Sequence, residues 1–302
     1  MSKVSVIIPT YNASRFLDKL IPKLKQQTIS FELLVIDSTS KDNTQEILEQ
    51  EGIRVIKIPQ EIFNHGSTRN LGLNYITGDI VIYLTQDALP VDNSCFEKLI
   101  QCFEDEKVAL AYGRQLPYQD ADVFGEFARL FNYPSENIMK DKASIPKMGI
   151  KTCFFSNSFG AYRKTVLENL GGFPDNVIFG EDFYTAAKAI LNGHTICYCA
   201  EAQVYHSHNY SIWEEFRRYF DIGILHKREN WILKNFKGAE STGLNYIKEE
   251  FFFILGKNKY VLIPSYFIRN ACKYIAYRLG KLENFLPIAI KRKLSMHRFY
   301  WH

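Results

Sequence analysis

The sequence has no run of about 18 uninterrupted apolar residues, the minimum for a helix that spans a membrane. The closest approach lies at residues 251–268, where a Gly-Lys-Asn-Lys segment and Pro264 break the apolar pattern. The N-terminus, MSKVSVIIP, enters a predicted strand almost at once, so no signal peptide is expected. We therefore predict a cytoplasmic protein without a membrane-spanning segment.

The sequence also lacks a dinucleotide-binding fingerprint and a paired-cysteine motif. No Gly-x-Gly-x-x-Gly follows the first predicted strand, which argues against a dehydrogenase. The six cysteines form no Cys-x-x-Cys pair, and a chain of 302 residues can bury a core without disulfides. We therefore interpret the cysteines as reduced thiols, as expected in the cytosol.

Charge is unevenly distributed along the chain. Residues 257–302 hold ten Lys/Arg and one acid, Glu283, for a net charge of +9, whereas the whole chain carries +4 and residues 1–256 therefore carry −5. The composition, 46% hydrophobic and 23% charged, is otherwise that of an ordinary globular protein. A basic C-terminal region on an acidic body indicates an anionic partner, either membrane headgroups or nucleic acid.

The first 115 residues alternate short β-branched runs with helical segments. Apolar runs predict buried strands, and the amphipathic stretches between them predict helices. Strands are predicted at residues 4–9, 32–37, 54–59, 79–85 and 108–114, and helices at 14–27, 42–51, 68–76 and near 92–105. This order predicts an α/β fold in which helices flank a mostly parallel sheet.

The alternation weakens beyond residue 115. The predicted elements there are a helix at 122–134, a polar loop at 135–152, a helix at 181–194, and short strands at 195–200 and 202–208. From residue 211 onward the pattern is mainly helical, and it mixes aromatic residues with Lys and Arg. The chain therefore divides into an α/β part, residues 1–210, and an appended helical region, residues 211–302.

Polar side chains follow three of the predicted strands. Thr10-Tyr11-Asn12 comes after the first strand, Asp37-Ser38 after the second and Asp87 after the fourth. Ligands of parallel sheets bind at the carboxyl ends of the strands. The sequence therefore predicts a binding site at this edge of the sheet.

Six segments occur in an order typical of one enzyme family. They are VSVIIPTYNA, LLVIDSTSKDNT, RNLGLNYITGDIVIYLTQDA, SNSFGAYRK with the later GGF, GEDFY, and VYHSH, and they extend over residues 3–210. In this order they resemble the inverting family 2 glycosyltransferases, whose fold is GT-A. The segments FNHGSTRNLG and LTQDA, with the C-terminal YRLGKLENFLPIAIKRKLSMHRFYW, further resemble the bacterial rhamnosyltransferase branch, which uses dTDP-L-rhamnose.

The resemblance implies a donor site around the strand ends. Asp37 would accept a hydrogen bond from the N3–H of a thymine or uracil, although it could instead cap its turn. Tyr11 would pack on the base or belong to the core, and Arg69 would pair with a diphosphate or lie solvated at the surface. Asp79 begins the fourth strand, at the opposite end from Asp87, and enters only through the resemblance. The expected donor-binding residues are Pro9, Thr10, Tyr11, Asp37, Ser38, His65, Arg69, Asp79, Gln86 and Asp87.

The resemblance also implies a divalent metal, Mg²⁺ or Mn²⁺. The family usually places Asp-x-Asp after this strand, but here the segment is Thr85-Gln86-Asp87, so one carboxylate is missing. Asp87 is expected to be the central ligand. His206 matches the family's C-terminal histidine and is either a further ligand or a core histidine.

The acid pair Glu181-Asp182 matches the position of the family's catalytic acids. Asp182 is expected to be the general base that deprotonates the acceptor hydroxyl, and Glu181 to position the acceptor or the helix. The alternative is that both acids interact only with the helix dipole. Inverting transfer from dTDP-β-L-rhamnose would give an α-linked rhamnoside.

These expectations define the partners. The donor would be a dTDP-sugar and the acceptor a glycan or lipid-linked oligosaccharide of bacterial capsule or cell-wall synthesis. The basic helical region would lie peripherally on the inner face of the plasma membrane, or form a homodimer contact. The alternatives are a UDP-hexose or UDP-HexNAc donor and, outside the enzymes, a nucleic-acid-binding protein. A nucleic-acid-binding module gives no reason to place Asp37, Asp87 and Asp182 at strand and helix ends, so no nucleic acid is expected.

Overall fold

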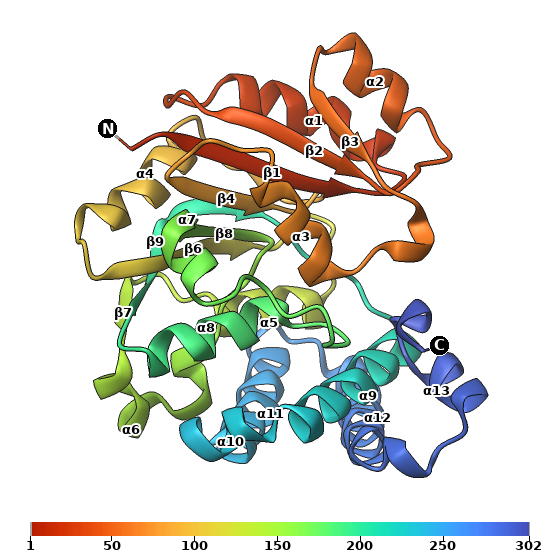
Figure 1. Ribbon diagram of the computed structural model, residues 1–302. Helices are drawn as coiled ribbons and strands as arrows, with labels where there is room; N and C mark the ends of the chain where they lie inside the picture. Colours follow the sequence, from red (N-terminus) through yellow and green to blue (C-terminus); the bar gives the residue numbers. More distant parts are fainter. Residues whose placement is uncertain (1, 302) are drawn as a thin grey trace.

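The computed structural model describes residues 2–301. Within them nine strands form one sheet in the order β3-β2-β1-β4-β8-β6-β9-β5, and β7 pairs with β9 (Figure 1). The strands are β1 Val4–Thr10, β2 Glu32–Asp37, β3 Arg54–Lys57, β4 Ile80–Leu84, β5 Leu89–Pro90, β6 Val108–Leu116, β7 Ile138–Lys140, β8 Phe159–Arg163 and β9 Thr195–Tyr205.

The first half of the sheet is parallel, as predicted, and the second half is mixed. Strands β3, β2, β1 and β4 all run in one direction. Strand β8 lies antiparallel between β4 and β6, whereas β6 and β9 are parallel to each other. The predicted pair of short strands at 195–208 is instead a single strand, β9, because its pairing with β6 continues past a register shift to Tyr205.

The central strands are apolar because both faces of the sheet are covered. Side chains alternate across a strand, so Ile7 enters one core cluster while Val6 and Ile8 enter the other. All five residues of β4 are buried. The polar residues that follow the strands are therefore anchored by a rigid frame.

Helices cover both faces of the sheet and form the C-terminal region. They are α1 Ser14–Lys25, α2 Thr44–Gln50, α3 His65–Leu73, α4 Cys95–Gln101, α5 Val123–Asn132, α6 Ile145–Met148, α7 Lys164–Asn169, α8 Glu181–Leu191, α9 Ile212–Arg228, α10 Asn230–Phe236, α11 Ala239–Gly256, α12 Ile263–Lys281 and α13 Ile288–Leu294. The predicted apolar stripe of α1 is buried at Leu17, Leu20, Ile21 and Leu24. Figure 1 shows α9 to α13 gathered on the side of the sheet where α5 and α8 lie.

Helices α9 and α12 cross at very short range. A β-carbon on Gly223 of α9 would lie 2.3 Å from the carbonyl oxygen of Tyr277, and one on Gly280 of α12 would lie 2.1 Å from that of Phe220. Only glycine allows the two backbones to come this close. This crossing fixes the packing of α9 against α12.

The buried side of α12 includes a lysine, and its exposed side is largely apolar. Lys273 faces inward and pairs with Glu215 of α9 at 3.3 Å and with Glu250 of α11 at 3.6 Å. Arg269 also pairs with Glu215, at 2.9 Å. The exposed positions of α12 include Pro264, Phe267, Ile268, Ala271, Tyr274 and Ile275, which we call the α12 stripe. Among residues 2–301, no helix is both long enough and apolar enough to cross a bilayer.

Candidate active site

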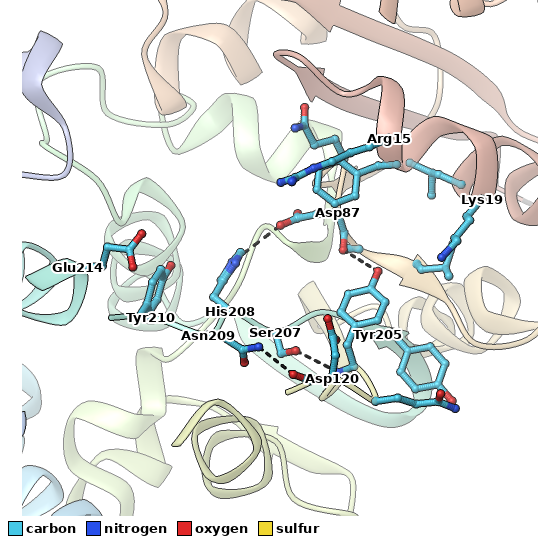
Figure 2. Close-up of a pocket in the computed structure, with 17 residues that line it drawn as sticks. Arg15, Lys19, Asp87, Asp120, Tyr205, Ser207, His208, Asn209, Tyr210 and Glu214 are labelled. Atoms are coloured by element: carbon cyan, nitrogen blue, oxygen red, sulfur yellow. Dashed lines mark hydrogen bonds and ion pairs between the residues drawn. The ribbon is translucent and has the colours of Figure 1, made fainter. Parts of the chain in front are cut away.

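Two cavities meet at the end of strand β4. The α1 cleft, about 1080 Å³, lies between α1, the loop after β4 and residues 205–210 (Figure 2). The acid cavity, about 580 Å³, is lined by both acids of α8. Asp87, His208 and Tyr210 line both cavities. Both volumes are in the range that ligand-binding sites of proteins occupy.

Asp87, His206 and His208 form a cluster whose ligand atoms all lie within 4.8 Å of one another. The Nε2 atoms of His206 and His208 lie 3.4 Å and 3.8 Å from Oδ2 of Asp87. Figure 2 shows His208 facing Asp87 from the opposite side of the cleft to Arg15 and Lys19 of α1. Both histidines lie in the segment that directly follows strand β9, which ends at Tyr205.

The orientation of His206 is set by the residues behind it. Its Nδ1 lies 2.8 Å from Oε1 of Gln115, and Arg129 donates a hydrogen bond to the same oxygen. Because that oxygen is an acceptor, Nδ1 carries the proton and Nε2 faces Asp87. Two acceptors this close repel each other unless Nε2 is also protonated or a cation lies between them, so the cluster fits a divalent metal.

The protonation states of the cluster also fit a metal site. Burial would raise the pKa of Asp87, but its contact with His206 and the imidazoles around it outweigh this effect and lower the pKa. Burial, together with the neighbouring His206, lowers the pKa of His208 to about 4. The Thr85 hydroxyl, two residues before Asp87, is buried without a hydrogen bond of normal geometry. Carboxylate and neutral imidazole are ligands that divalent transition metals accept.

Asp182 sits in the first turn of α8 and lines the acid cavity. Its Oδ2 accepts a hydrogen bond from the backbone N–H of Asn157 at 2.9 Å, and its Oδ1 accepts one from that of Phe183 at 2.7 Å. Burial, and next the charge of Glu181, raise the pKa of Asp182 to about 7, against the effect of these two amides. A carboxylate with a pKa near neutrality can take up a proton during a reaction at neutral pH.

Glu181 is held in a different state. It is buried, and its Oε1 lies 3.0 Å from Nη1 of Arg69 and accepts a hydrogen bond from the side chain of Asn157 at 3.0 Å. Burial would raise the pKa of Glu181, but Arg69 and then His65 outweigh it and lower the pKa. Two adjacent acids are thus driven to opposite pKa shifts, which separates a proton acceptor, Asp182, from a permanently charged neighbour.

Arg69 and His65 reach the acid cavity from α3. Gly66, between them, must be glycine, because a β-carbon there would lie 1.9 Å from the carbonyl oxygen of Pro174. The guanidinium of Arg69 also donates to the carbonyl oxygen of His65 at 2.9 Å. Arg69 is therefore neither solvated nor free. Its guanidinium forms an ion pair with Glu181.

The expected base-binding residues are packed more tightly than the sequence suggests. Asp37 is fully buried, and its carboxylate accepts hydrogen bonds from Thr10, from the backbone and side chain of Ser40, and from Gln45. Asp37 therefore orders the two loops around it, and a direct contact with a base would require Ser40 or Gln45 to move. The Ser38 hydroxyl is also buried and has no hydrogen-bond partner.

The remaining donor-site candidates lie on or near the first strand. Tyr11 is half-buried, and Gln86 is paired with its backbone N–H and C=O at 2.8 Å and 3.1 Å. Gln86 also lines the α1 cleft, whereas Pro9, Thr10, Tyr11, Asp37 and Ser38 line neither of the two cavities. Gln86 thus joins the loop after β1 to the segment that carries Asp87.

Asp79 lies apart from the other expected donor-site residues. Asp79 precedes β4 at the end opposite to Asp87, and its carboxylate accepts a hydrogen bond from the backbone N–H of Lys3 at 3.1 Å. Across five residues of strand the two aspartates are separated by roughly 17 Å of backbone. Asp79 caps the amino-terminal edge of the sheet.

Sequence reasoning missed several residues of the site. His208 stands two positions after His206 in VYHSH, and this spacing at the end of a strand was an available signal. Asn157, which binds both acids of α8, lies in the quoted segment SNSFGAYRK, but no sequence pattern points to a backbone amide. The helical region after residue 211 also lines the acid cavity, through residues that include Arg218, Tyr219, Ile222, Leu225, Lys273 and His297.

The family follows from comparison of the whole chain with known proteins. The model named glycosyl transferase family 2 matches residues 5–171, more than half of the chain. The chain belongs to glycosyltransferase family 2. It is therefore a glycosyltransferase, and the six sequence segments led to the correct family.

Two relatives of this family 2 enzyme match over the full chain. The O-antigen chain rhamnosyltransferase RfbN of Salmonella typhimurium is 45% identical over 303 residues, covering 99% of this chain and 96% of that protein. The O-antigen chain rhamnosyltransferase WbaN of Salmonella anatum is 42% identical, covering 100% of this chain and 96% of that protein. A more distant relative, the glycosyltransferase AglE of Haloferax volcanii, is 28% identical over 65% of this chain and 64% of its own length.

Solved structures place the fold in the GT-A class. The mannosyltransferase PcManGT from Pyrobaculum calidifontis, in complex with GDP-Man and Mn²⁺, has a TM-score of 0.62 at 17% identity, covering 94% of this chain and 88% of that one. S. aureus TarS 1-349 in complex with UDP has a TM-score of 0.56 at 18% identity, covering 93% and 91%. At such low identity these likenesses establish the fold, including the helical C-terminal region, and nothing about substrates.

Proposed function

We propose that this protein transfers L-rhamnose from dTDP-β-L-rhamnose to a hydroxyl of a glycan or lipid-linked oligosaccharide in bacterial surface-polysaccharide synthesis. The full-length likeness to two O-antigen chain rhamnosyltransferases is the observation that carries this proposal. The acid cavity supplies the groups that such a transfer needs, a proton acceptor and a candidate cation site at one cavity wall. The product is an α-linked rhamnoside, since transfer inverts the β-configured donor.

The acid pair of α8 divides the chemical work. Ionised Asp182 accepts the proton of the acceptor hydroxyl while that oxygen bonds to the anomeric carbon. The bond from the anomeric carbon to the donor phosphate breaks in the same step, and dTDP leaves with the bonding electrons. Glu181 does not take the proton, because Arg69 and Asn157 keep its carboxylate charged. The amides of Asn157 and Phe183 fix the direction of the Asp182 carboxylate.

Asp87, His206 and His208 would hold the divalent cation. When bound, the ion would neutralise the departing diphosphate as a Lewis acid. Two imidazoles among the three ligands favour Mn²⁺ over Mg²⁺, because Mg²⁺ binds oxygen ligands almost exclusively. Gln115 and Arg129 keep Nε2 of His206 directed at the site.

Turnover of a donor panel tests this function. Purified enzyme with membranes that contain the acceptor should release dTDP from dTDP-β-L-rhamnose and should be slower by an order of magnitude or more with UDP-glucose, UDP-GlcNAc or GDP-mannose. EDTA should stop the reaction, and Mn²⁺ should restore it better than Mg²⁺. Faster turnover of a UDP-hexose or UDP-HexNAc would replace rhamnose as the transferred sugar. Equal turnover in EDTA would remove the metal.

We further propose that the α12 stripe rests on an anionic bilayer, on the inner face of the plasma membrane. Phe267 and Ile275 of the stripe are 60% and 52% exposed, and Phe285 beyond it is 81% exposed. Residues 257–302 hold ten Lys and Arg side chains, of which Arg269 and Lys273 face inward, and the only acid of this segment, Glu283, is buried and paired with Arg228 and Lys291. A second copy would bring two basic surfaces together, whereas anionic headgroups complement them.

Vesicle sedimentation tests the membrane proposal. The protein should pellet with vesicles of phosphatidylglycerol and phosphatidylethanolamine at low salt, and less so with phosphatidylcholine alone or at high salt. Protein that stays wholly in the supernatant with anionic vesicles at low salt would overturn it. Sedimentation velocity on the same sample would reveal a homodimer, and retention on DNA comparable to that on vesicles would favour a nucleic acid instead.

A further inference from the structure

Arg218 of α9 is a cation in the acid cavity without a partner. Within residues 2–301 its guanidinium forms no hydrogen bond and no ion pair. It lies over the ring of Phe179, 5.5 Å from the ring centre, and is half-buried. A guanidinium has five N–H donors and pairs well with carboxylate and phosphate, so one that has no protein partner in a cavity points to an anionic ligand.

The other cations of the same cavity are already committed. Arg69 pairs with Glu181 at 3.0 Å, and Arg129 donates a hydrogen bond to Gln115. Lys273 pairs with Glu215 and Glu250. Asp182, the neighbour of Glu181 in the cavity wall, is bound by two backbone amides and not by Arg218. Among the Arg and Lys side chains of residues 2–301 that line the cavity, Arg218 alone has neither a hydrogen bond nor an ion pair.

The C-terminal segment holds Phe179, on which Arg218 rests. The imidazole of His297 stacks on the ring of Phe179, with ring centres 5.7 Å apart and an angle of 7° between the planes. His297 in turn contacts His65 of α3, 5.3 Å between ring centres. The backbone beside His297 is fixed because Arg217 donates to the carbonyl oxygen of Ser295 at 2.8 Å and Asp221 accepts from the N–H of Met296 at 2.9 Å. Arg218 thus stands on a fixed aromatic support.

We propose that Arg218 binds the diphosphate of a substrate in the acid cavity. The proposal rests on the proposed function only in that the enzyme handles a diphosphate, whatever its sugar. Two sources share this chemistry: the nucleoside diphosphate of the donor, and a prenyl diphosphate that carries the acceptor glycan. A guanidinium suits either one, because its two N–H edges can pair with two phosphate oxygens at once. The helical region thereby contributes a substrate-binding residue to the site and does not serve only as an appendage.

Calorimetric titration of Arg218→Ala, Arg218→Lys and a matched control tests this role. Lys234→Ala removes one exposed cation from α10 that forms no ion pair, and should leave all affinities unchanged. The ligands are dTDP, UDP and GDP with Mn²⁺, each compared with its monophosphate, and farnesyl diphosphate as a probe for the acceptor side. Thermal unfolding of each variant shows that it is folded, and Arg218→Lys, which keeps the charge, should lose less affinity than Arg218→Ala.

If the donor diphosphate is the ligand, Arg218→Ala should weaken the tightest-binding nucleoside diphosphate by about tenfold or more and its monophosphate much less. KM for the donor should then rise more than kcat falls. If the acceptor is the source, farnesyl diphosphate binding and KM for the acceptor should change instead. Changes below twofold for every diphosphate, in a folded variant, would overturn the proposal. A preference for UDP or GDP would refute the dTDP donor and leave the role of Arg218 intact.

Discussion

The two halves of the molecule differ in what they bury beside their apolar cores. In the α/β half, apolar side chains fill both faces of the sheet and polar residues lie at the strand ends, where the site forms. In the helical half, α12 turns Lys273 and Arg269 inward to Glu215 and Glu250, and turns Phe267, Ile268, Tyr274 and Ile275 outward.

This difference indicates what each half faces. The first half follows the usual rule for a protein in water. In the second half, burying four charges costs desolvation energy. The large apolar side chains on its surface add no hydrophobic stabilisation unless a membrane or another molecule covers them. The inner, charged side of α9 and α12 lines the acid cavity through Arg218 and Lys273. The outer, apolar side is available to a bilayer, so one helix layer joins the catalytic site to the proposed membrane surface.

The largest effect is expected in the α/β half, from Asp182→Asn. Removing the proton acceptor should lower kcat by about 10²- to 10⁴-fold and leave dTDP binding nearly unchanged. In the wild type the rate should rise with pH through about 7, because Asp182 must lose its proton to act. Rate assays against pH, with calorimetry for dTDP, measure both. A variant that loses dTDP binding instead would not support Asp182 as the base.

The stability of the same variant gives an independent check on Asp182. Folding raises the pKa of Asp182, so its contribution to stability is present at low pH and is lost as pH rises through about 7. Asn does not ionise. The melting temperature of Asp182→Asn minus that of the wild type should therefore be larger at pH 8 than at pH 5. The same difference at both pH values would mean that the carboxyl is not perturbed by folding.

In the helical half, the largest expected effect comes from the buried charges. Lys273→Met leaves Glu250 buried without its cation and should destabilise the fold by about 3–5 kcal/mol. Burial already raises the pKa of Glu250, so the loss should be smaller at pH 5, where this acid can take a proton, than at pH 8. Denaturant unfolding measures it. Adding Glu250→Gln to Lys273→Met should restore part of the lost free energy of unfolding. If the double variant is no more stable than Lys273→Met, the two residues are not energetically coupled.

The metal cluster is expected to respond at an intermediate level. His208→Ala removes one of three ligands and should raise the Mn²⁺ concentration for half-maximal activity by about tenfold or more. His194→Ala is a matched control, since His194 lies before β9 and lines neither cavity. If the two variants reach half-maximal activity at the same Mn²⁺ concentration, His208 is not a metal ligand. The close contact between Asp87 and His206 would then be explained by a proton on Nε2 of His206 instead of a cation.

The smallest change in stability is expected on the α12 stripe. Phe267→Ser should alter the free energy of unfolding by less than about 1 kcal/mol, because the side chain is already exposed. It should nevertheless reduce sedimentation with anionic vesicles severalfold. Ile62→Ser, at a similarly exposed position of the α/β half, should change neither quantity. Equal vesicle binding by both variants would contradict the proposed division between the halves.

Local pattern was enough to predict the parallel half of the sheet and its strand ends. Asp87 could be singled out because it follows a buried strand, whereas Asp182 was singled out by the resemblance of Glu181-Asp182 to the family's acid pair. The antiparallel insertion of β8 could not be predicted, since pairing between distant strands leaves no local periodicity. Nor does sequence show that Ser40 and Gln45 enclose Asp37, or that Arg69 is taken by Glu181.

The helical half was the least predictable from the sequence, because its contacts join residues that are far apart in the chain. Its basic and aromatic composition indicated a surface, and the structure shows that the basic residues divide between an interior network and the outside. Arg218 could not be recognised from the sequence as the cation without a partner. That property becomes visible only when the partners of Arg69, Arg129 and Lys273 are known.

The stereochemistry of the product tests the central claim most directly. Purified enzyme should be incubated with dTDP-β-L-rhamnose, Mn²⁺ and acceptor-bearing membranes, and the new linkage read by NMR of the released oligosaccharide. We expect an α-L-rhamnoside from the wild type, formed at least about a hundredfold more slowly by Asp182→Asn. A β-linked product, or rhamnose transfer by Asp182→Asn at a rate near that of the wild type, would contradict single inversion with Asp182 as the base.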